Sequence, residues 1–349
     1  GTFIENVPFV GEDIPLERRL AQGWDGRLYS DLTRLDEGDL LVPNDTFYLR
    51  TFYPDLLVPP APWGISVTGL VETEETITVD ALLPLVRDQG THVLECSGNG
   101  RRGGFGLMSA ASWAGIDVMT VLDMVRVRPE ATRVLIRGFD EHSVPSVGGH
   151  STPGAAWVFT FEELAAAGAF FATEMNDAPL PNDHGAPLRL YVPGWYGCAS
   201  IKWVTEIILV DDDVAATGQM MEFASRTHQP GVPTLARDFH PALMDQAAMA
   251  TRVERWEVDG APLYKVVGVM WGGYEPTSAL SFSSGPGDAA AVEVCPAQSQ
   301  NSLWTLFQHP FRPSAAREFS LRYFIEDARI PTRRLDAGYY ARNVTVDAI

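Results

Sequence analysis

Apolar and polar positions alternate, or form short apolar runs bounded by turn residues, along much of the chain. This pattern predicts a protein made mainly of β-strands. In the first 210 residues the predicted strands lie at 46–52, 63–71, 91–96, 134–139, 188–192 and 201–210. Apolar residues with helical spacing predict short helices at 79–87 and 116–125. Residues 160–163 (T-F-E-E) form a capping-box pattern, which predicts a helix through about residue 167.

The pattern changes after residue 210. Three aspartates at 211–213 precede a segment rich in Ala, Gly and Met, which indicates a linker. Beyond it, strands are predicted at 254–258, 265–270, 290–294 and 319–324, separated by turns rich in Gly, Pro and Ser. Short strands at this spacing favour a β-sandwich. Residues 1–45 are polar and acidic and predict an irregular lead-in with a short helix near 16–22.

Length and composition fit a soluble protein of two domains. At about 150 residues per domain, the 349 residues divide into a domain at 1–215 and a second at 216–349. The composition is 46% hydrophobic and 20% charged, which is normal for a globular chain with a sizeable core. No apolar run approaches the roughly 20 residues that cross a bilayer, so we expect no membrane span. The chain starts at Gly1 without a signal peptide, which leaves a removed export signal open.

The formal net charge of −19 restricts the class of partner. It argues against nucleic acid, whose affinity comes mainly from phosphate neutralisation by Lys and Arg. It suits a cationic partner protein instead. Lys202 and Lys265 are the only lysines. The 3 cysteines, Cys96, Cys198 and Cys295, do not form a disulfide framework or a CxxC motif, so the compartment stays open on this evidence.

Cys96 ends a predicted strand and begins a glycine-rich loop that allows several chemistries. Residues 98–103 spell G-N-G-R-R-G, a dinucleotide-binding pattern, but further glycines follow where a helix should open. A cysteine nucleophile would need a base such as His92 or His184. A single thiolate ahead of a rigid turn also suits a redox-active metal. For this loop alone, a buried structural cysteine is the commonest explanation.

Several motifs in order change that balance. Residues 96–102 (C-S-G-N-G-R-R) resemble the C-[AS]-G-N-R-R loop of the sulfite oxidase family, with one extra glycine. Residues 47–50 (F-Y-L-R), 113–115 (W-A-G) and 138–140 (G-F-D) resemble flanking motifs of the same family. The longest match runs from Glu174 to Arg189 and resembles E-M-N-G-x-P-L-P-x-D-H-G-x-P-x-R. The likeness continues through residues 193–194 and 200–203 and extends weakly to 267–273.

This resemblance implies a molybdenum-dependent oxidoreductase. The implied fold is α+β: a mixed, mainly β molybdopterin domain followed by an immunoglobulin-like β-sandwich. The implied cofactor is molybdenum-molybdopterin, with Cys96 as the protein's metal ligand, and the implied reaction is a two-electron oxygen-atom transfer. Arg50, and Arg101 or Arg102, would face an oxyanion substrate. The implied cofactor-binding residues are Phe47, Tyr48, Arg50, Asp140, His184, Arg189, Ser200, Ile201 and Lys202.

Elementary electrostatics supports the implied cofactor-binding residues. Arginine and lysine are suitable partners for the anionic tail of the pterin, and Arg189 and Lys202 lie in the matched region. Taken singly, an arginine or lysine of this kind is more often a charge on the protein surface. A histidine such as His184 is more often a core residue whose hydrogen bonds are made within the protein. A protein that keeps the fold without the metal and binds without catalysis is the alternative from another class.

The substrate side departs from the family pattern. Phe52 stands where a histidine is common, Phe223 aligns with an expected catalytic tyrosine, and Thr305 aligns with an arginine of the C-terminal domain. Residues 143–157 look longer than the equivalent segment. Lost charge-assisted hydrogen bonds cost about 1.5–3 kcal/mol each. We therefore expect a substrate other than sulfite, larger or less charged, or a family member acting as a reductase.

The resemblance also implies partners and a compartment. No haem domain of the cytochrome b type fits in the length, so we expect electrons to pass to an external acceptor, such as a c-type cytochrome. The acidic surface would suit a basic acceptor. Family members of this kind are usually homodimers and exported bacterial enzymes. We expect a homodimer in the periplasm, with the cytoplasm left open.

Overall fold

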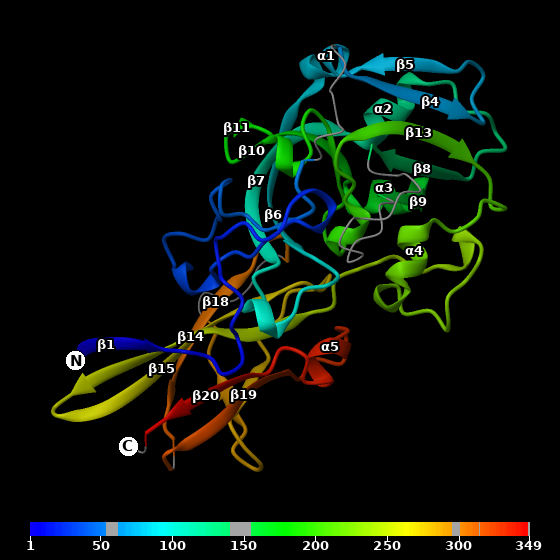
Figure 1. Cartoon of the computed structure of the whole chain (residues 1–349). Coiled ribbons are helices and arrows are strands. Elements are labelled where there is room, and N and C mark those ends of the chain that lie inside the picture. The colour runs from blue at the N-terminus through cyan, green and yellow to red at the C-terminus, as the bar shows by residue number, and fades with distance from the viewer. Residues whose placement is uncertain (54–61, 140–154, 295–300, 314, 348–349) are drawn as a thin grey trace.

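The computed structural model describes the chain except residues 54–61, 140–154, 295–300, 314 and 348–349. Within the described part the chain is built mainly of short strands, with five α-helices of one or two turns (Figure 1). The mixed, mainly β fold predicted from the sequence is confirmed. One group of sheets holds the central part of the sequence, and a second group holds the C-terminal part.

The first central sheet carries the strand that leads to Cys96. Its order is β11-β10-β7-β6, with β12 also beside β10, and all pairs are antiparallel. Its strands are β6 (Arg87–Glu95), β7 (Met108–Asp117), β10 (Phe170–Met175), β11 (Ala178–Pro179) and β12 (Arg189–Tyr191). β7 is buried along most of its length, and β6 becomes buried toward its C-terminal end, just before Cys96. The ends of β6 and β12 are where two parts of the predicted site begin.

The second central sheet has the order β5-β4-β13-β8-β9. Its strands are β4 (Gly64–Gly69), β5 (Glu75–Thr78), β8 (Arg133–Gly138), β9 (Ala156–Thr160) and β13 (Val204–Val210). β13 and β4 are parallel and the other pairs are antiparallel. The helices α1 (Val79–Leu82), α2 (Val118–Met124) and α3 (Phe161–Ala167) follow strands. Thr160 and Glu163 form the predicted capping box at the start of α3, which confirms that prediction.

Two four-stranded antiparallel sheets make up the lower part of Figure 1. One has the order β1-β14-β15-β18, with β1 (Thr2–Val7), β14 (Ala247–Val258), β15 (Ala261–Trp271) and β18 (Thr305–Phe311). The other has the order β17-β16-β19-β20, with β16 (Leu280–Ser283), β17 (Ala290–Val292), β19 (Arg317–Ile325) and β20 (Arg342–Val346). Aromatic rings pack between them; Phe307 and Tyr323 are 4.9 Å apart. The predicted sandwich therefore has an aromatic core.

The N-terminal segment differs from the prediction. β1 pairs with β14, so the first residues of the chain complete a sheet of the C-terminal part (Figure 1). The helix expected near residues 16–22 is absent from this described segment, since Glu17 and Ala21 have positive φ angles. A two-stranded ribbon of β2 (Arg27–Leu28) and β3 (Leu49–Arg50) follows instead. The partner of β1 is over 240 residues away along the chain, so local patterning could not predict the pairing.

The segment after β13 lies close to the central sheets. Its helix α4 (Gly218–Glu222) is capped by Thr217, whose hydroxyl donates to the Ala156 carbonyl of β9 at 2.6 Å. Helix α5 (Arg333–Asp336) precedes β20. Single 3-10 turns are η1 (Gly23–Asp25), η2 (Leu32–Arg34), η3 (Leu83–Leu85), η4 (Arg101–Gly103), η5 (Asn182–His184), η6 (Gly197–Ala199), η7 (Ala224–Arg226) and η8 (Ala236–Asp238). Residues just after the predicted boundary at 215 therefore contact the central sheets.

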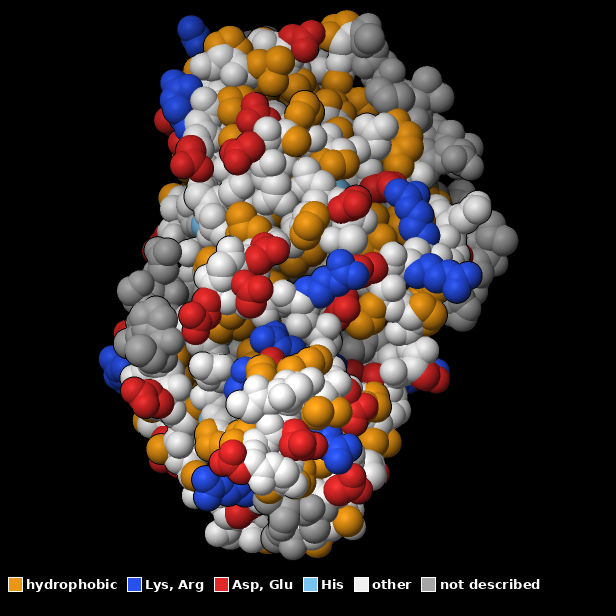
Figure 2. Space-filling view, turned by 90° about the vertical axis from the view of Figure 1, so that its left-hand side faces the viewer, with side chains coloured by type: hydrophobic (Ala, Val, Ile, Leu, Met, Phe, Trp, Pro, Cys, Tyr) orange, Lys and Arg blue, Asp and Glu red, His pale blue; other side chains and the backbone are white. Residues whose placement is uncertain are grey.

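The surface carries both signs of charge. On the face shown in Figure 2, acidic and basic side chains are interspersed with apolar ones. Among the described residues, no helix has the length and apolar character to cross a membrane.

Candidate functional site

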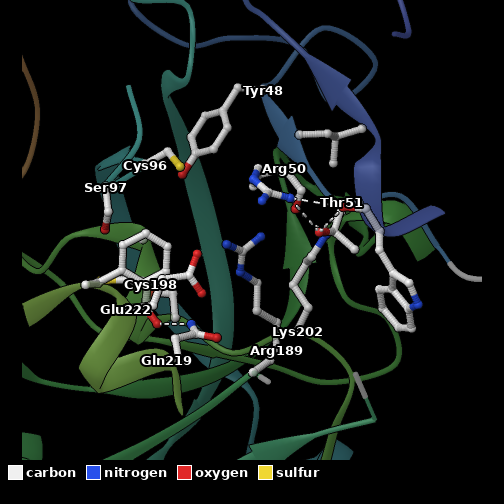
Figure 3. Close-up of a pocket in the computed structure, with 16 residues that line it drawn as sticks. Tyr48, Arg50, Thr51, Cys96, Ser97, Arg189, Cys198, Lys202, Gln219 and Glu222 are labelled. Atoms are coloured by element: carbon white, nitrogen blue, oxygen red, sulfur yellow. Dashed lines mark hydrogen bonds between the residues drawn. The ribbon is translucent and has the colours of Figure 1, made fainter. Parts of the chain in front are cut away.

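A cavity lies where several separate stretches of the chain meet, four of which supply most of its lining (Figure 3). These four are the β3 region, the end of β6, the segment from β12 to Lys202, and α4 with Phe223; Trp24 and Ala155 add single residues. The lining residues are Trp24, Tyr48, Leu49, Arg50, Thr51, Cys96, Ser97, Ala155, Arg189, Gly197, Cys198, Ser200, Lys202, Gln219, Glu222 and Phe223. Several predicted site residues thus lie together although they are far apart in the sequence.

Cys96 lies at this cavity as a free, half-buried thiol. The Cys96 amide donates to the Leu107 carbonyl at 2.9 Å, and its carbonyl accepts from the Asn99 amide at 3.0 Å. Gly197 lies opposite, since a Cβ added there would be 3.7 Å from the Cys96 Cα and 2.8 Å from the Tyr48 hydroxyl. Burial raises the pKa of Tyr48 well above 10, and the neighbouring Cys96 adds to the shift. The thiol therefore sits in a fixed turn with its sulfur open to the cavity.

The two rival chemistries of this loop gain no support. The glycine-rich segment forms only the single turn η4 (Arg101–Gly103), so no helix N-terminus is available for a pyrophosphate. His92 Nε2 bonds the Gln89 carbonyl at 2.7 Å. Neither His92 nor His184 is among the described residues that line the cavity, so no base of the predicted pair faces the thiol.

Three cations face the cavity from different elements (Figure 3). Arg50 Nη1 donates to the Trp24 carbonyl at 3.0 Å. Arg189 is buried and donates from Nη1 to the His184 carbonyl at 3.1 Å. Burial lowers the pKa of both arginines. Arg189 Nε has no hydrogen-bond partner in the described part of the chain, so it is a donor available to a bound group.

The Lys202 ammonium is hydrogen-bonded to backbone carbonyls beside the cavity. Its ammonium donates to the carbonyls of Arg50 at 3.3 Å, Asp183 at 2.9 Å and Thr51. It also lies 4.4 Å from the ring centre of Trp203. A lysine has three N–H donors, so Lys202 gives the cavity its charge while its donors hold the backbone.

The remaining predicted cofactor residues divide into lining and supporting positions. Ser200 lines the cavity, and its hydroxyl accepts from the Val192 amide at 3.2 Å. His184 lies behind the lining; its Nε2 bonds the Asn44 carbonyl at 2.9 Å, and burial lowers its pKa to about 3. Phe47 packs on the His184 ring at 5.4 Å, and Ile201 is 1% exposed. Asp140 lies outside the described residues.

Arg101 and Arg102 are the main disagreement with the sequence-based site. Both side chains are exposed on η4, and neither lines the cavity. The glycines explain this orientation: a Cβ at Gly103 would lie 2.2 Å from the Tyr29 ring, and Gly104 has a left-handed φ of 58°. The turn therefore directs Phe105 inward, at 0% exposure, and leaves both arginines outside. The prediction that one of them faces the substrate is not supported.

Sequence reasoning missed a carboxylate in the cavity. Glu222, from α4, points its carboxylate into the space between the labelled side chains (Figure 3). It is the only carboxylate among the described lining residues, and its charge acts on Arg50. Phe223 follows it in the lining, at the position aligned with a tyrosine. Little in the sequence assigns Glu222 to the site, because residues 219–223 have the composition of a linker.

The donor set fits a molybdopterin group better than a metal held by several protein ligands. No group of three or more His, Cys, Asp and Glu that could hold a metal occurs among the residues that the structure describes. Two free thiols line the cavity, but burial raises the pKa of Cys198 to about 12, so Cys96 is the better candidate for a thiolate ligand. One soft thiolate beside buried cationic groups suits a metal that an organic ligand also holds, together with an anionic tail. The partnerless Arg189 Nε is consistent with a bound anion.

Comparison with known proteins agrees with this geometry. Residues 53–217 match the oxidoreductase molybdopterin binding domain family. Mitochondrial sulfite oxidase of Drosophila melanogaster is 29% identical over 52% of this chain, and that of Rattus norvegicus is 25% identical over 67%. The sulfane dehydrogenase SoxCD of Paracoccus pantotrophus shares the fold, with a TM-score of 0.68, 18% identity and coverage of 95% of this chain and 93% of that chain.

The alignments cover 33% of the fruit-fly enzyme and 45% of the rat enzyme, so the chain spans less than half the length of these relatives. The matched domain includes Cys96, Arg189 and Lys202, which are the candidate ligand thiol and two of the cations of the cavity. The order of the motifs, the fold and the domain match agree with one another. The chain therefore belongs to the sulfite oxidase family of molybdopterin-dependent oxidoreductases.

Proposed function

We propose that this chain is a molybdenum-dependent oxidoreductase that carries out two-electron oxygen-atom transfer on a small substrate. The observation that supports this proposal most is the Cys96 thiol, which faces a cavity lined by Arg50, Arg189 and Lys202. A soft sulfur ligand beside three cations is suited to a redox metal on an anionic organic cofactor. A non-catalytic binding protein would have no need for this combination.

When bound, molybdenum-molybdopterin supplies an oxygen atom to exchange and a store for two electrons. Cys96 would be the protein ligand of the metal. Arg189 would donate to the anionic part of the cofactor, and Ser200 also lines the cavity. Lys202 would add positive charge and keep the backbone of Arg50 and Thr51 in place. Arg50, which lies next to Lys202 in the cavity (Figure 3), would orient the substrate.

We propose further that sulfite is not the preferred substrate. Phe52 is 4% exposed, packs with Leu28 and Leu49, and is not among the described residues that line the cavity, so it supplies no polar contact there. Phe223 lines the cavity without a hydroxyl group. The Glu222 carboxylate repels an oxyanion that approaches Arg50. A larger or less negatively charged sulfur, nitrogen or related compound fits this lining better, and the reduction of such a compound is the alternative reaction.

The first experiment is metal analysis of protein produced in a host that makes the cofactor, together with the fluorescence of the released, oxidised pterin. One molybdenum per chain supports the proposal. No molybdenum in such protein would support the binding-protein alternative. Cys96→Ser should lose turnover in a dye-linked assay, whereas Arg101→Ala should retain it, because the Arg101 side chain lies outside the cavity.

The substrate part is tested with the same dye and a panel of oxidisable and reducible compounds, sulfite included. We expect turnover with a compound less charged than sulfite and weak saturation by sulfite. A low micromolar KM with fast turnover of sulfite would contradict this part and leave the general reaction standing.

We also propose that electrons leave to a separate acceptor, such as a c-type cytochrome, and that the protein works as an exported, periplasmic homodimer. The net charge of −19 supports a basic acceptor. Reduction of a basic cytochrome by the substrate-reduced enzyme, and the mass of the native protein in solution, test the acceptor and the dimer separately.

A further inference from the structure

Glu95, the residue before Cys96, is completely buried, with an exposure of 0%. It ends β6, where successive side chains point to opposite faces. Cys96 faces the cavity, and Glu95 faces residues of the C-terminal part of the chain. The two neighbouring side chains thus connect two different parts of the molecule through one short stretch of backbone.

Four donors surround the Glu95 carboxylate. Its two oxygens accept from Trp271 Nε1 at 2.9 Å, Tyr340 Oη at 2.8 Å, Asn99 Nδ2 at 3.3 Å and Arg334 Nη1 at 3.4 Å. Trp271 ends β15 and Arg334 lies in α5, so the donors come from separate elements. A buried carboxylate is costly unless its oxygens are satisfied. These contacts fix the position of Glu95 and therefore of the strand end.

The same C-terminal residues also hold the loop after Cys96. The Asn99 carbonyl accepts from Arg334 Nη2 at 3.4 Å and from the Tyr339 hydroxyl. The Asn99 side chain accepts from the Leu107 amide at 3.1 Å. The Arg334 guanidinium lies 4.0 Å from the ring centre of Tyr339 and 5.2 Å from that of Tyr340. Residues on both sides of Cys96 are thus tied to one C-terminal segment.

We propose that Glu95 is a positioning residue: through it, Trp271, Arg334 and Tyr340 set the direction in which the Cys96 sulfur enters the cavity. Glu95 is not a catalytic residue, because its side chain points away from the cavity. The functional part of this inference rests on the proposed function, in which Cys96 binds the metal. The mechanical part, the ordering of residues 96–107, depends on the contacts alone.

The test compares Glu95→Gln with a matched control variant, Glu254→Gln. Glu95→Gln keeps the shape of the side chain, but it replaces one acceptor oxygen by a donor and removes the charge that pairs with Arg334. Glu254 is also buried and accepts from Arg252 at 2.7 Å, Lys265 at 2.6 Å and Trp256 at 2.9 Å. Because Glu254 does not line the cavity, its variant reports the effect of neutralising a buried, paired carboxylate elsewhere.

Three quantities are measured on the holoenzyme. We expect Glu95→Gln to increase amide hydrogen exchange at Asn99 and Leu107 at least tenfold, to change the electron paramagnetic resonance spectrum of Mo(V), and to lower kcat at least tenfold with KM within twofold. Glu254→Gln should leave all three near the wild-type values. Unchanged exchange and an unchanged Mo(V) spectrum in Glu95→Gln, or equal changes in both variants, would overturn the proposal.

Tyr340→Phe provides a milder variant in case Glu95→Gln does not fold, because it removes a single donor at 2.8 Å. It should change exchange and the Mo(V) spectrum in the same direction and by a smaller amount; wild-type values for both would count against the proposal. If the wild-type protein binds no molybdenum, the proposed function fails, and hydrogen exchange still decides whether Glu95 orders the loop.

Discussion

Arg189 combines burial, positive charge and a spare donor in the cavity. It is 6% exposed, and its Nε has no partner among the described residues. A buried cation in this state is costly by itself and becomes favourable when an anion binds. Among the cavity's cations, Arg189 is therefore the residue on which retention of an anionic cofactor should depend most.

Arg189→Met should lower the molybdenum content of the purified protein. The variant loses charge-assisted hydrogen bonds worth about 1.5–3 kcal/mol each, or roughly tenfold in affinity for each 1.4 kcal/mol. The check is metal content per chain after dialysis, with Arg101→Met as the control because Arg101 is exposed and lies outside the cavity. Equal metal content in both variants would contradict the role given to Arg189.

His184 makes the stability of the fold depend on pH. Burial lowers its pKa to about 3, below the roughly 6.5 of an unfolded histidine. Between these values the unfolded chain binds a proton that the folded chain does not, so stability falls as the pH decreases from about 6.5 toward about 3. The contribution of one such group reaches about 1.4 kcal/mol per pH unit.

Urea unfolding of the wild type and of His184→Gln between pH 4 and pH 7 measures this contribution. The wild type should lose stability more steeply on acidification than the variant. The partly buried histidines His92, His228 and His309 also have lowered pKa values and remain in both proteins, so the difference in slope isolates His184. Identical slopes would show that His184 is not neutral in the folded state.

At the scale of elements, the stability of a short helix depends on the hydrogen bonds at its ends. Helix α3 has seven residues, and both hydrogen bonds of its capping box are present: Thr160 N to Glu163 at 2.8 Å and Glu163 N to Thr160 at 3.0 Å. Thr160 also ends β9, the strand against which α4 packs. A local sequence signal therefore stabilises a strand-to-helix junction near the cavity.

Thr160→Ala should destabilise the protein by about 1 kcal/mol, because it removes the acceptor at the N-cap. Thr160→Ser, which keeps the hydroxyl, should stay close to the wild type. Chemical unfolding of the three proteins measures the difference in free energy. If Ala and Ser have equal effects, the capping hydroxyl does not contribute.

At the scale of the whole molecule, residues near both ends of the chain contact segments that are distant in the sequence. β1 completes a C-terminal sheet, and residues 334–340 hold the loop that carries Cys96. The net charge of −19 adds a long-range field that attracts a basic acceptor. Because acidic and basic side chains are interspersed on the face of Figure 2, that face shows no single patch of one sign.

The rate of electron transfer to a basic cytochrome should fall steeply with ionic strength. Electrostatic steering raises association rates well above the roughly 10⁵–10⁶ M⁻¹s⁻¹ of uncharged encounters, and salt screens it over about 10 Å at 0.1 M. Stopped-flow kinetics between 10 and 300 mM salt, with an acidic cytochrome for comparison, would measure the effect. The same salt dependence with both cytochromes would exclude steering by the net charge.

The sequence alone determined much of this protein. The loop after Cys96 was ambiguous by itself, and the ordered motifs around it identified the thiol at the cavity. Period-two patterning predicted strands such as β4, β8 and β13, and the capping box predicted α3, whereas β7 and β10 were not predicted. These features are local, because alternation and capping act over a few residues. The motif order added the family and its cofactor.

Only the tertiary structure decided which charges meet. Arg101 and Arg102 match a family motif, but the packing of Gly103 against Tyr29 turns them outward, while Glu222 enters the cavity from a segment that resembles a linker. Glu95 gains its partners from residues about 175 to 245 positions away. Such contacts depend on how distant elements pack, and no local periodicity encodes them.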